Sequence, residues 1–255
     1  MNRRRPRVDL TAPRPVGALV ADALRLYAAH PALFFLLALV VVAPYELVVL
    51  AATGTSPLGQ QTAPASTAIT LLLLDFVLVV PLVSALHVRA VAAMARDESP
   101  RLRDVLWEGI RVWPVVAAAS VVADIGIGIG IILFILPGVV LAIRWAVVAQ
   151  TAAVERTDWM GALRRGAALT GGSYLHVFGV LVVTSVFTYG VLSAGEAAAG
   201  SHAGAGQVVL GIAVDTVTRS FTALISAVLY FELRGRAGEA ARPGPTDINL
   251  DGSRR

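Results

Sequence analysis

The sequence predicts an all-α polytopic membrane protein with six transmembrane helices, and three observations carry this prediction. Of the 255 residues, 56% are hydrophobic and only 15% are charged, whereas soluble globular proteins are about one quarter charged. Six stretches are apolar over close to the ~20 residues that a helix needs to cross a bilayer. Arginines gather in every second connection between these stretches, which is the positive-inside pattern.

The predicted spans cover residues 31–52, 67–90, 112–134, 136–154, 173–193 and 207–231. The third and fourth spans are almost continuous in sequence. We expect Pro137 and Gly138 to separate them, because proline cannot donate to the helix ladder and disfavours a helical residue before it. The glycines of "DIGIGIGIIL", 124–133, have GxxxG spacing, which favours close packing of the third span against a neighbouring helix.

The arginine alternation sets the orientation. Connections 52–67 and 194–206 contain no arginine, whereas 89–111 and 155–172 are basic, as are both ends of the chain. We therefore predict a multi-pass protein of the bacterial inner membrane with both termini cytoplasmic. A membrane domain over 15–234 would lie between a cytoplasmic tail, 1–14, and a tail, 235–255, that we expect to be disordered because it lacks periodicity.

Three basic segments are amphipathic and are predicted to form cytoplasmic surface helices: 16–31, 102–113 and 159–170. In the first, Val16, Leu19, Val20, Ala23, Leu24 and Tyr27 share one face, with Asp22 and Arg25 off it. In the third, Arg164 and Arg165 are expected to face anionic lipid headgroups. The alternative is that the apolar faces pack under the bundle. Each segment precedes an odd-numbered span, which indicates a threefold parallel repeat, although cytoplasmic loops are often amphipathic in any case.

Seven ionisable residues fall inside the predicted spans: Glu46, Asp75, His87, Asp124, Arg144, Asp215 and Arg219. Asp215 and Arg219 are four residues apart and can pair on one helix face. Asp124 and Arg144 have similar expected depths, so we predict a second pair between them. Glu46 and Asp75 are left without an obvious basic partner. Two interpretations follow: the charges fix helix register, or they form a polar path for protons, ions or a headgroup.

Several classes of function find no support in the sequence. There is no cysteine, and the four histidines are scattered without metal-ligand spacing. No motif of a hydrolase, zinc protease or nucleotide-binding loop is present. We therefore predict a non-enzyme with no catalytic residue, cofactor or metal. The arginines are not interleaved with aromatic residues as a nucleic-acid surface requires, so membrane lipids, and an unidentified protein, are the expected partners.

One stretch resembles a known family. Residues 136–181, "LPGVVLAIRWAVVAQTAAVERTDWMGALRRGAALTGGSYLHVFGVL", are similar to the glycerophosphoryl diester phosphodiesterase membrane domain and its YciC-like relatives. The matching positions are Pro137, Gly138, Arg144, Trp145, Ala162, Leu163, Arg165, Leu169, Thr170 and Gly172. The segments 14–31 and 229–236 also resemble the ends of that family. The resemblance implies the membrane part alone, because no segment here could form the family's catalytic barrel.

Two hypotheses for function result. The first is a non-catalytic membrane module that organises lipid or a partner protein at the cytoplasmic face, with Arg164 and Arg165 toward lipid. The second is a small transporter or channel that uses the intramembrane acids Glu46, Asp75, Asp124 and Asp215.

Overall fold

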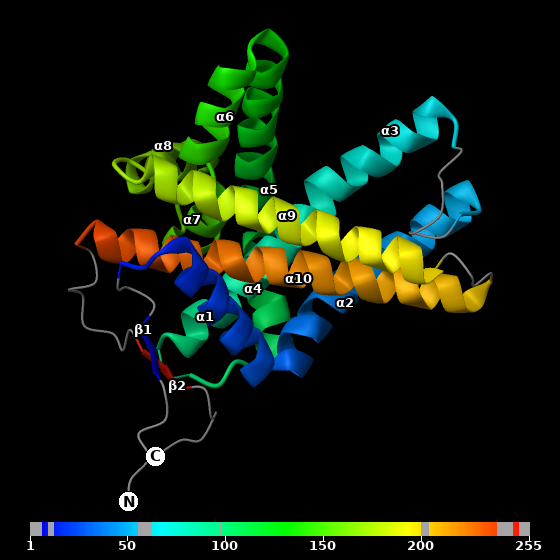
Figure 1. Ribbon diagram of the computed structural model, residues 1–255, viewed down its shortest axis with the longest axis horizontal. Helices are drawn as coiled ribbons and strands as arrows, with labels where there is room; N and C mark the ends of the chain where they lie inside the picture. The colour runs from blue at the N-terminus through cyan, green and yellow to red at the C-terminus, as the bar shows by residue number, and fades with distance from the viewer. Residues whose placement is uncertain are drawn as a thin grey trace, which may run out of the picture.

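The computed structural model describes residues 7–9, 13–55, 63–96, 98–199, 204–238 and 247–249. Six of its helical stretches are long and apolar enough to cross a membrane, and Figure 1 shows their arrangement. They cover Pro31–Thr53, Ala65–Met94, Leu102–Leu133, Ile135–Glu155, Tyr174–Ala199 and Ala205–Arg236. Each overlaps one predicted span, so the all-α polytopic fold is confirmed.

The first two helices meet at a proline. Helix α1 (Val16–Ala29) is followed by α2 (Pro31–Thr53), and Pro31 suits the first turn of a helix because its missing N–H would be unpaired there anyway. Helix α2 ends at Gly54, whose φ of 70° is a left-handed conformation that glycine adopts without steric cost.

The second span contains a π-helical turn. It consists of α3 (Ala65–Leu74), η1 (Asp75–Val79) and α4 (Val80–Met94). Pro81 has no N–H to offer to the carbonyl group of Val77, one turn earlier. That carbonyl oxygen instead accepts a hydrogen bond from Nε1 of Trp113 at 3.2 Å. The π-helical turn is therefore joined to the third span by this hydrogen bond.

The third and fourth spans correct two predictions. Residues 102–113 are not a separate surface helix but the first turns of α5 (Leu102–Leu133), which continues through Pro114. The break before α6 (Ile135–Arg144) falls at the extended residue Phe134, not at Pro137. Pro137 lies in the first turn of α6, where helix N–H groups have no partner within the helix, so the proline costs no hydrogen bond.

The fourth span is itself interrupted. Turn residues 145–147 separate α6 from α7 (Val148–Glu155). Helix α8 (Trp159–Leu169) follows, and the N-cap residue Asp158 accepts a hydrogen bond from the Gly161 amide at 3.0 Å. The chain then forms two long helices, α9 (Tyr174–Ala199) and α10 (Ala205–Arg236).

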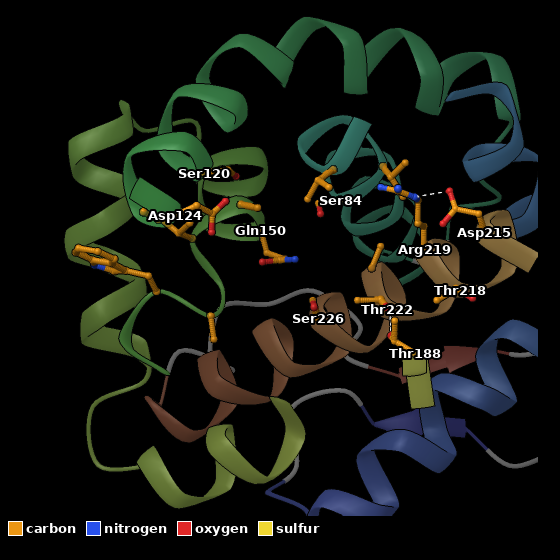
Figure 2. A pocket seen from close by; sticks show the side chains of 18 of the residues that line it. Ser84, Ser120, Asp124, Gln150, Thr188, Asp215, Thr218, Arg219, Thr222 and Ser226 are labelled. Atoms are coloured by element: carbon orange, nitrogen blue, oxygen red, sulfur yellow. Dashed lines mark hydrogen bonds and ion pairs between the residues drawn. The ribbon is translucent and has the colours of Figure 1, made fainter. Parts of the chain in front are cut away.

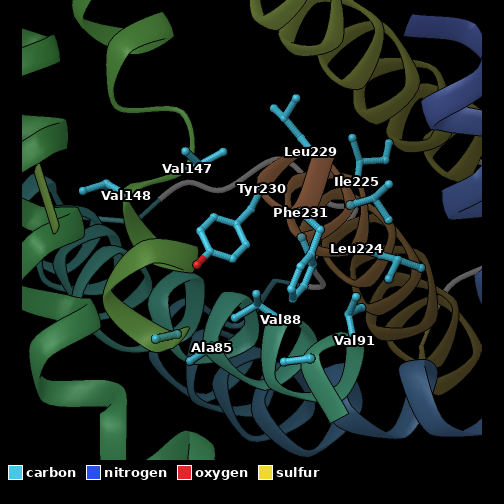
Figure 3. Close-up of a cluster of buried hydrophobic side chains, with 14 of the residues drawn as sticks. Ala85, Val88, Val91, Val147, Val148, Leu224, Ile225, Leu229, Tyr230 and Phe231 are labelled. Atoms are coloured by element: carbon cyan, nitrogen blue, oxygen red, sulfur yellow. The ribbon is translucent and has the colours of Figure 1, made fainter. Parts of the chain in front are cut away.

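Helix α10 is the centre of the molecule. It packs against α1, α2, α4 and α9, and it lies side by side with α9 in Figure 1, whereas the α5–α6 hairpin projects away from these two helices. The main hydrophobic core forms where α10 meets α4 and the start of α7. Its buried side chains, shown in Figure 3, include Leu224, Tyr230, Val88 and Val148.

The predicted face of α1 is partly wrong. Leu24 is 56% exposed, whereas Asp22 is only 6% exposed because it pairs with Arg14 and Arg25. In α8, Leu163 is buried against the core and Arg164 is exposed, as predicted. The threefold repeat is not uniform, because the second surface segment is fused to its span whereas α1 and α8 are separate helices.

The two ends of the chain also meet. Strand β1 (Arg7–Asp9) pairs antiparallel with β2 (Asp247–Asn249). The prediction of a disordered tail over 235–255 is therefore wrong at 247–249, and at 235–236, which belong to α10. Residues 239–246 and 250–255 lie outside the described part of the chain.

We expect Gly130, which forms the GxxxG pair of α5 with Gly126, to matter for packing, and Gly128, which lies between them, not to matter. A Cβ atom added at Gly130 would lie 2.8 Å from Cα of Gly138, whereas one at Gly128 would meet no atom within 4 Å. Gly130→Ala should therefore lower the free energy of unfolding by ~1–3 kcal/mol. Gly128→Ala should change it by less than about 1 kcal/mol, in the stabilising direction. Denaturant unfolding in detergent micelles measures both, and equal losses would contradict close packing of α5 on α6.

Candidate functional site

A cavity with both polar and apolar side chains in its wall lies among five of the described helices. Its volume is about 430 Å³, and α4, α5, α7, α9 and α10, together with the turn between α6 and α7, contribute to its wall. Figure 2 labels its polar side chains, which are Ser84, Ser120, Asp124, Gln150, Thr188, Asp215, Thr218, Arg219, Thr222 and Ser226. Polar groups at this density inside apolar spans are the feature expected of a path or a binding site.

At one end of the cavity, Arg219 holds two acids. Its Nε donates to Oδ2 of Asp215 at 2.6 Å, and its Nη1 donates to Oδ1 of Asp75 at 2.7 Å. The predicted pair within the sixth span is thus confirmed. The expectation that Asp75 has no basic partner is wrong, because the π-helical turn begins at Asp75 and α10 packs along this span. The three side chains are 16–23% exposed.

Two residues of α2 complete this cluster. The Arg219 guanidinium carbon lies 5.9 Å from the ring centroid of Tyr45, a cation–π geometry. Glu46 is 6% exposed, and its carboxyl group adjoins that of Asp215. Three acids therefore surround one arginine. No further basic side chain joins them among the described residues.

At the other end of the cavity, Asp124 and Gln150 share no such partner. Within the described residues, no hydrogen bond or ion pair reaches the Asp124 carboxylate. Gln150 is 2% exposed, and its Oε1 likewise has no hydrogen-bond partner in the described part of the chain. Both side chains lie on the cavity side of their helices in Figure 2. Asp124 is partly exposed, whereas the Gln150 oxygen is buried, and an acceptor is costly to bury unless something satisfies it.

The predicted pair between Asp124 and Arg144 does not form. Arg144 is exposed and is the last residue of α6. Its backbone oxygen accepts a hydrogen bond from Oγ1 of Thr170 at 3.2 Å, which occupies a carbonyl that the interruption leaves free. The prediction assumed one straight helix over the fourth span, and the turn at 145–147 carries the arginine away from Asp124.

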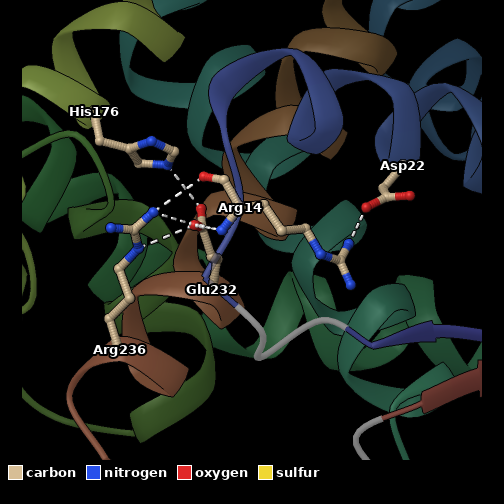
Figure 4. A network of polar contacts seen from close by, with 5 residues as sticks. All are labelled: Arg14, Asp22, His176, Glu232 and Arg236. Atoms are coloured by element: carbon tan, nitrogen blue, oxygen red, sulfur yellow. Dashed lines mark hydrogen bonds and ion pairs between the residues drawn. The ribbon is translucent and has the colours of Figure 1, made fainter.

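A second polar network fixes the far end of α10 (Figure 4). Glu232 is 1% exposed and accepts hydrogen bonds from the Arg14 amide at 2.9 Å and from Nη2 of Arg236 at 2.7 Å. Nε2 of His176 lies 2.8 Å from Glu232 Oε2. His176 is thus a partner in this network. The residues come from three distant segments, so local spacing gives a signal only for Glu232 and Arg236, which are four residues apart on α10.

The other predicted polar residues have separate roles. His87 is fully buried, and its two ring nitrogens lie 2.8 Å from the Val83 carbonyl oxygen and the Ser220 hydroxyl. Arg164 is exposed. Arg165 was expected to face lipid beside it, but Nε of Arg165 donates to Glu155 at 2.9 Å. This correction leaves one of the two candidate lipid-facing arginines in place.

Comparison with known proteins adds no assignment. No protein-family model matches the chain, and neither the curated proteins nor the solved structures include a significant match. The resemblance of 136–181 to the phosphodiesterase membrane domain therefore stays a prediction.

The two intramembrane arginines should differ sharply in their contribution to stability. Arg219→Gln leaves two partly buried acids without their partner and should cost about 3 kcal/mol. Arg144→Gln removes an exposed charge and should cost no more than about 0.5 kcal/mol. Asp75→Asn combined with Arg219→Gln should lose less than the sum of the single losses, because the pair interacts directly. Unfolding in micelles gives all four values, and a larger loss at Arg144 would contradict the assignment.

Proposed function

We propose that the protein is a small membrane transporter or channel that admits a polar solute to the cavity between α4, α5, α7, α9 and α10. The observation that carries this proposal is that two acceptors on the wall of that cavity have no hydrogen-bond partner among the described residues: the buried Oε1 of Gln150 and the partly exposed carboxylate of Asp124. A charged side chain that only fixes helix register needs a partner of opposite charge, as Arg219 has in Asp215. Acceptors without partners favour a bound or passing solute.

The proposal also agrees with the chemistry of the wall. Hydroxyl groups of Ser84, Ser120 and Ser226 line the cavity together with apolar side chains, and small hydroxyl residues let helices approach closely while offering hydrogen bonds. We therefore infer binding or passage of a solute.

Organisation of lipid or a partner at the surface is the second candidate. It is favoured by the exposed guanidinium groups of Arg164 and of Arg25, whose side chain is 65% exposed. The ion pair of Arg165 with Glu155 and the burial of Leu163 weigh against it, because they use the α8 helix for packing within the protein. The transporter hypothesis therefore takes precedence.

Cysteine accessibility tests whether the cavity is wet. The chain has no cysteine, so single variants need no altered background. Ser120→Cys, Thr222→Cys and Ser226→Cys should react with a small water-soluble methanethiosulfonate reagent in membranes. Val122→Cys and Val186→Cys, exposed apolar positions on the outer surface of the spans, should react far more slowly because a thiolate does not form in hydrocarbon. Equal rates at cavity and control positions would refute the transporter proposal.

We further propose that the protein lies in a bacterial inner membrane with both termini in the cytoplasm, as the alternating arginines support. Thr55→Cys and Gly206→Cys should then label from outside intact cells with an impermeant maleimide. Thr157→Cys should label only after the cells are permeabilised. Labelling of all three variants in permeabilised cells is the control that each thiol is reactive. Outside labelling at Thr157 would reverse the orientation.

A further inference from the structure

We propose that the end of the cavity formed by Asp124, Gln150 and Trp145 binds the head group of a small organic cation, an ammonium ion. This inference rests on the proposed function and names the class of its solute. Ser120 belongs to the same end, because it lies one turn before Asp124 on α5 and therefore on the same helix face.

The charged side chains around the cavity favour a positively charged solute. Asp124 lines the cavity with no ion pair or hydrogen bond from the described residues. The basic side chain on the cavity wall, Arg219, already holds Asp75 and Asp215. A cation would therefore find an unpaired carboxylate, whereas an anion would have to displace one of two bound acids from the arginine. The start of α7 also faces this space, but a helix end offsets only about half a charge.

The hydrogen-bonding groups on the cavity wall favour the same kind of solute. Gln150 Oε1 is an acceptor without a partner on a side chain that is 2% exposed. A carboxylate is also an acceptor only. Two neighbouring acceptors favour a ligand that donates hydrogen bonds or carries polarised C–H groups around a positive nitrogen, and both descriptions fit an ammonium ion.

An aromatic ring on the cavity wall also favours a cation. Trp145 lines the same cavity and belongs to the turn between α6 and α7. Its indole sits where Gly126 leaves room, because a Cβ atom there would lie 2.6 Å from Cζ3 of Trp145. Tryptophan is the side chain that attracts cations most strongly through its ring face, and ring-lined sites recognise quaternary ammonium groups.

These observations favour an organic cation over a metal ion. Calcium takes about six to eight oxygen ligands, several of them carboxylates. The described residues contain no group of three or more histidine or acidic side chains that could hold a metal ion. Much of the remaining wall is apolar, including Val80, Val83 and Ala123, and it can contact the carbon atoms of an organic solute. A cavity of about 430 Å³ suits a small molecule.

Choline and its uncharged carbon isostere, 3,3-dimethylbutan-1-ol, separate charge from shape. Binding of each to the full chain in lipid nanodiscs is measured by calorimetry, with choline supplied as its chloride. We expect choline to bind at least roughly tenfold more tightly than the isostere, because only choline can pair with Asp124 and the Trp145 ring. Equal affinities would overturn the inference and leave the transporter proposal intact.

Variants locate the site. Asp124→Asn and Trp145→Leu should each weaken choline binding by roughly tenfold or more and leave the affinity for the isostere within about threefold. Glu196→Gln, which removes an exposed acid of α9, should change neither affinity. Equal effects of Asp124→Asn and Glu196→Gln on choline binding would place the cation elsewhere and overturn the inference.

Absence of binding is also informative. If neither molecule binds while the cavity cysteines react with the thiol reagent, the organic-cation inference fails and the transporter proposal survives with another solute. If neither binds and the cavity cysteines are as slow as Val122→Cys, both proposals fail. Because wild-type protein supplies the comparison of the two ligands, a misfolded variant does not remove the test.

Discussion

A charged side chain inside a membrane has no water to solvate it and needs partners within the protein. The position of α10 follows from this constraint. Arg219 lies within a membrane span and satisfies its guanidinium group with Asp215 on its own helix and with Asp75 on the second span. The second bond fixes the depth of α10 against the π-helical turn that begins at Asp75. Since α10 packs on α1, α2, α4 and α9, this one arginine sets the register for most of the bundle.

The same helix is held a second time at its other end, where Glu232 gathers the amide of Arg14, His176 and Arg236. Apolar packing around Leu224 and Tyr230 joins the two polar ends. A helix fixed at both ends tolerates an incompletely packed flank, because its position does not depend on that flank. The cavity lies along that flank, between α10 and the interrupted fourth span. The polar contacts at both ends of α10 therefore allow the cavity to exist beside it.

Hydropathy alone located all six spans, because the length of an apolar run is dictated by the bilayer and not by tertiary contacts. Spacing located the pair of Asp215 and Arg219, which is local to one helix. The sequence failed at Arg144, where no glycine or proline marks the turn at 145–147. That turn depends on distant partners: Thr170 donates a hydrogen bond to the Arg144 carbonyl oxygen, and α8 packs against α7, with Gly166 beside Val148. The Glu232 network was missed for the same reason.

The structural and functional interpretations of the intramembrane charges differ in how they account for the balance of acids and bases. A role in fixing helix register is enough to explain the presence of Arg219, Asp215 and Asp75, since each acid forms a direct ion pair with the arginine. It does not explain Glu46, a buried third acid beside a single guanidinium, or Asp124, which has no counterpart among the described residues. Glu46 and Asp124 lie at opposite ends of the polar region, with the hydroxyl-lined cavity between their helices. An excess of acids over bases at both ends of a polar space costs stability, because a buried acid must be either desolvated as an anion or held protonated. A positively charged solute in the cavity would relieve that cost under the proposed function, whereas a purely structural interpretation leaves the excess without a cause.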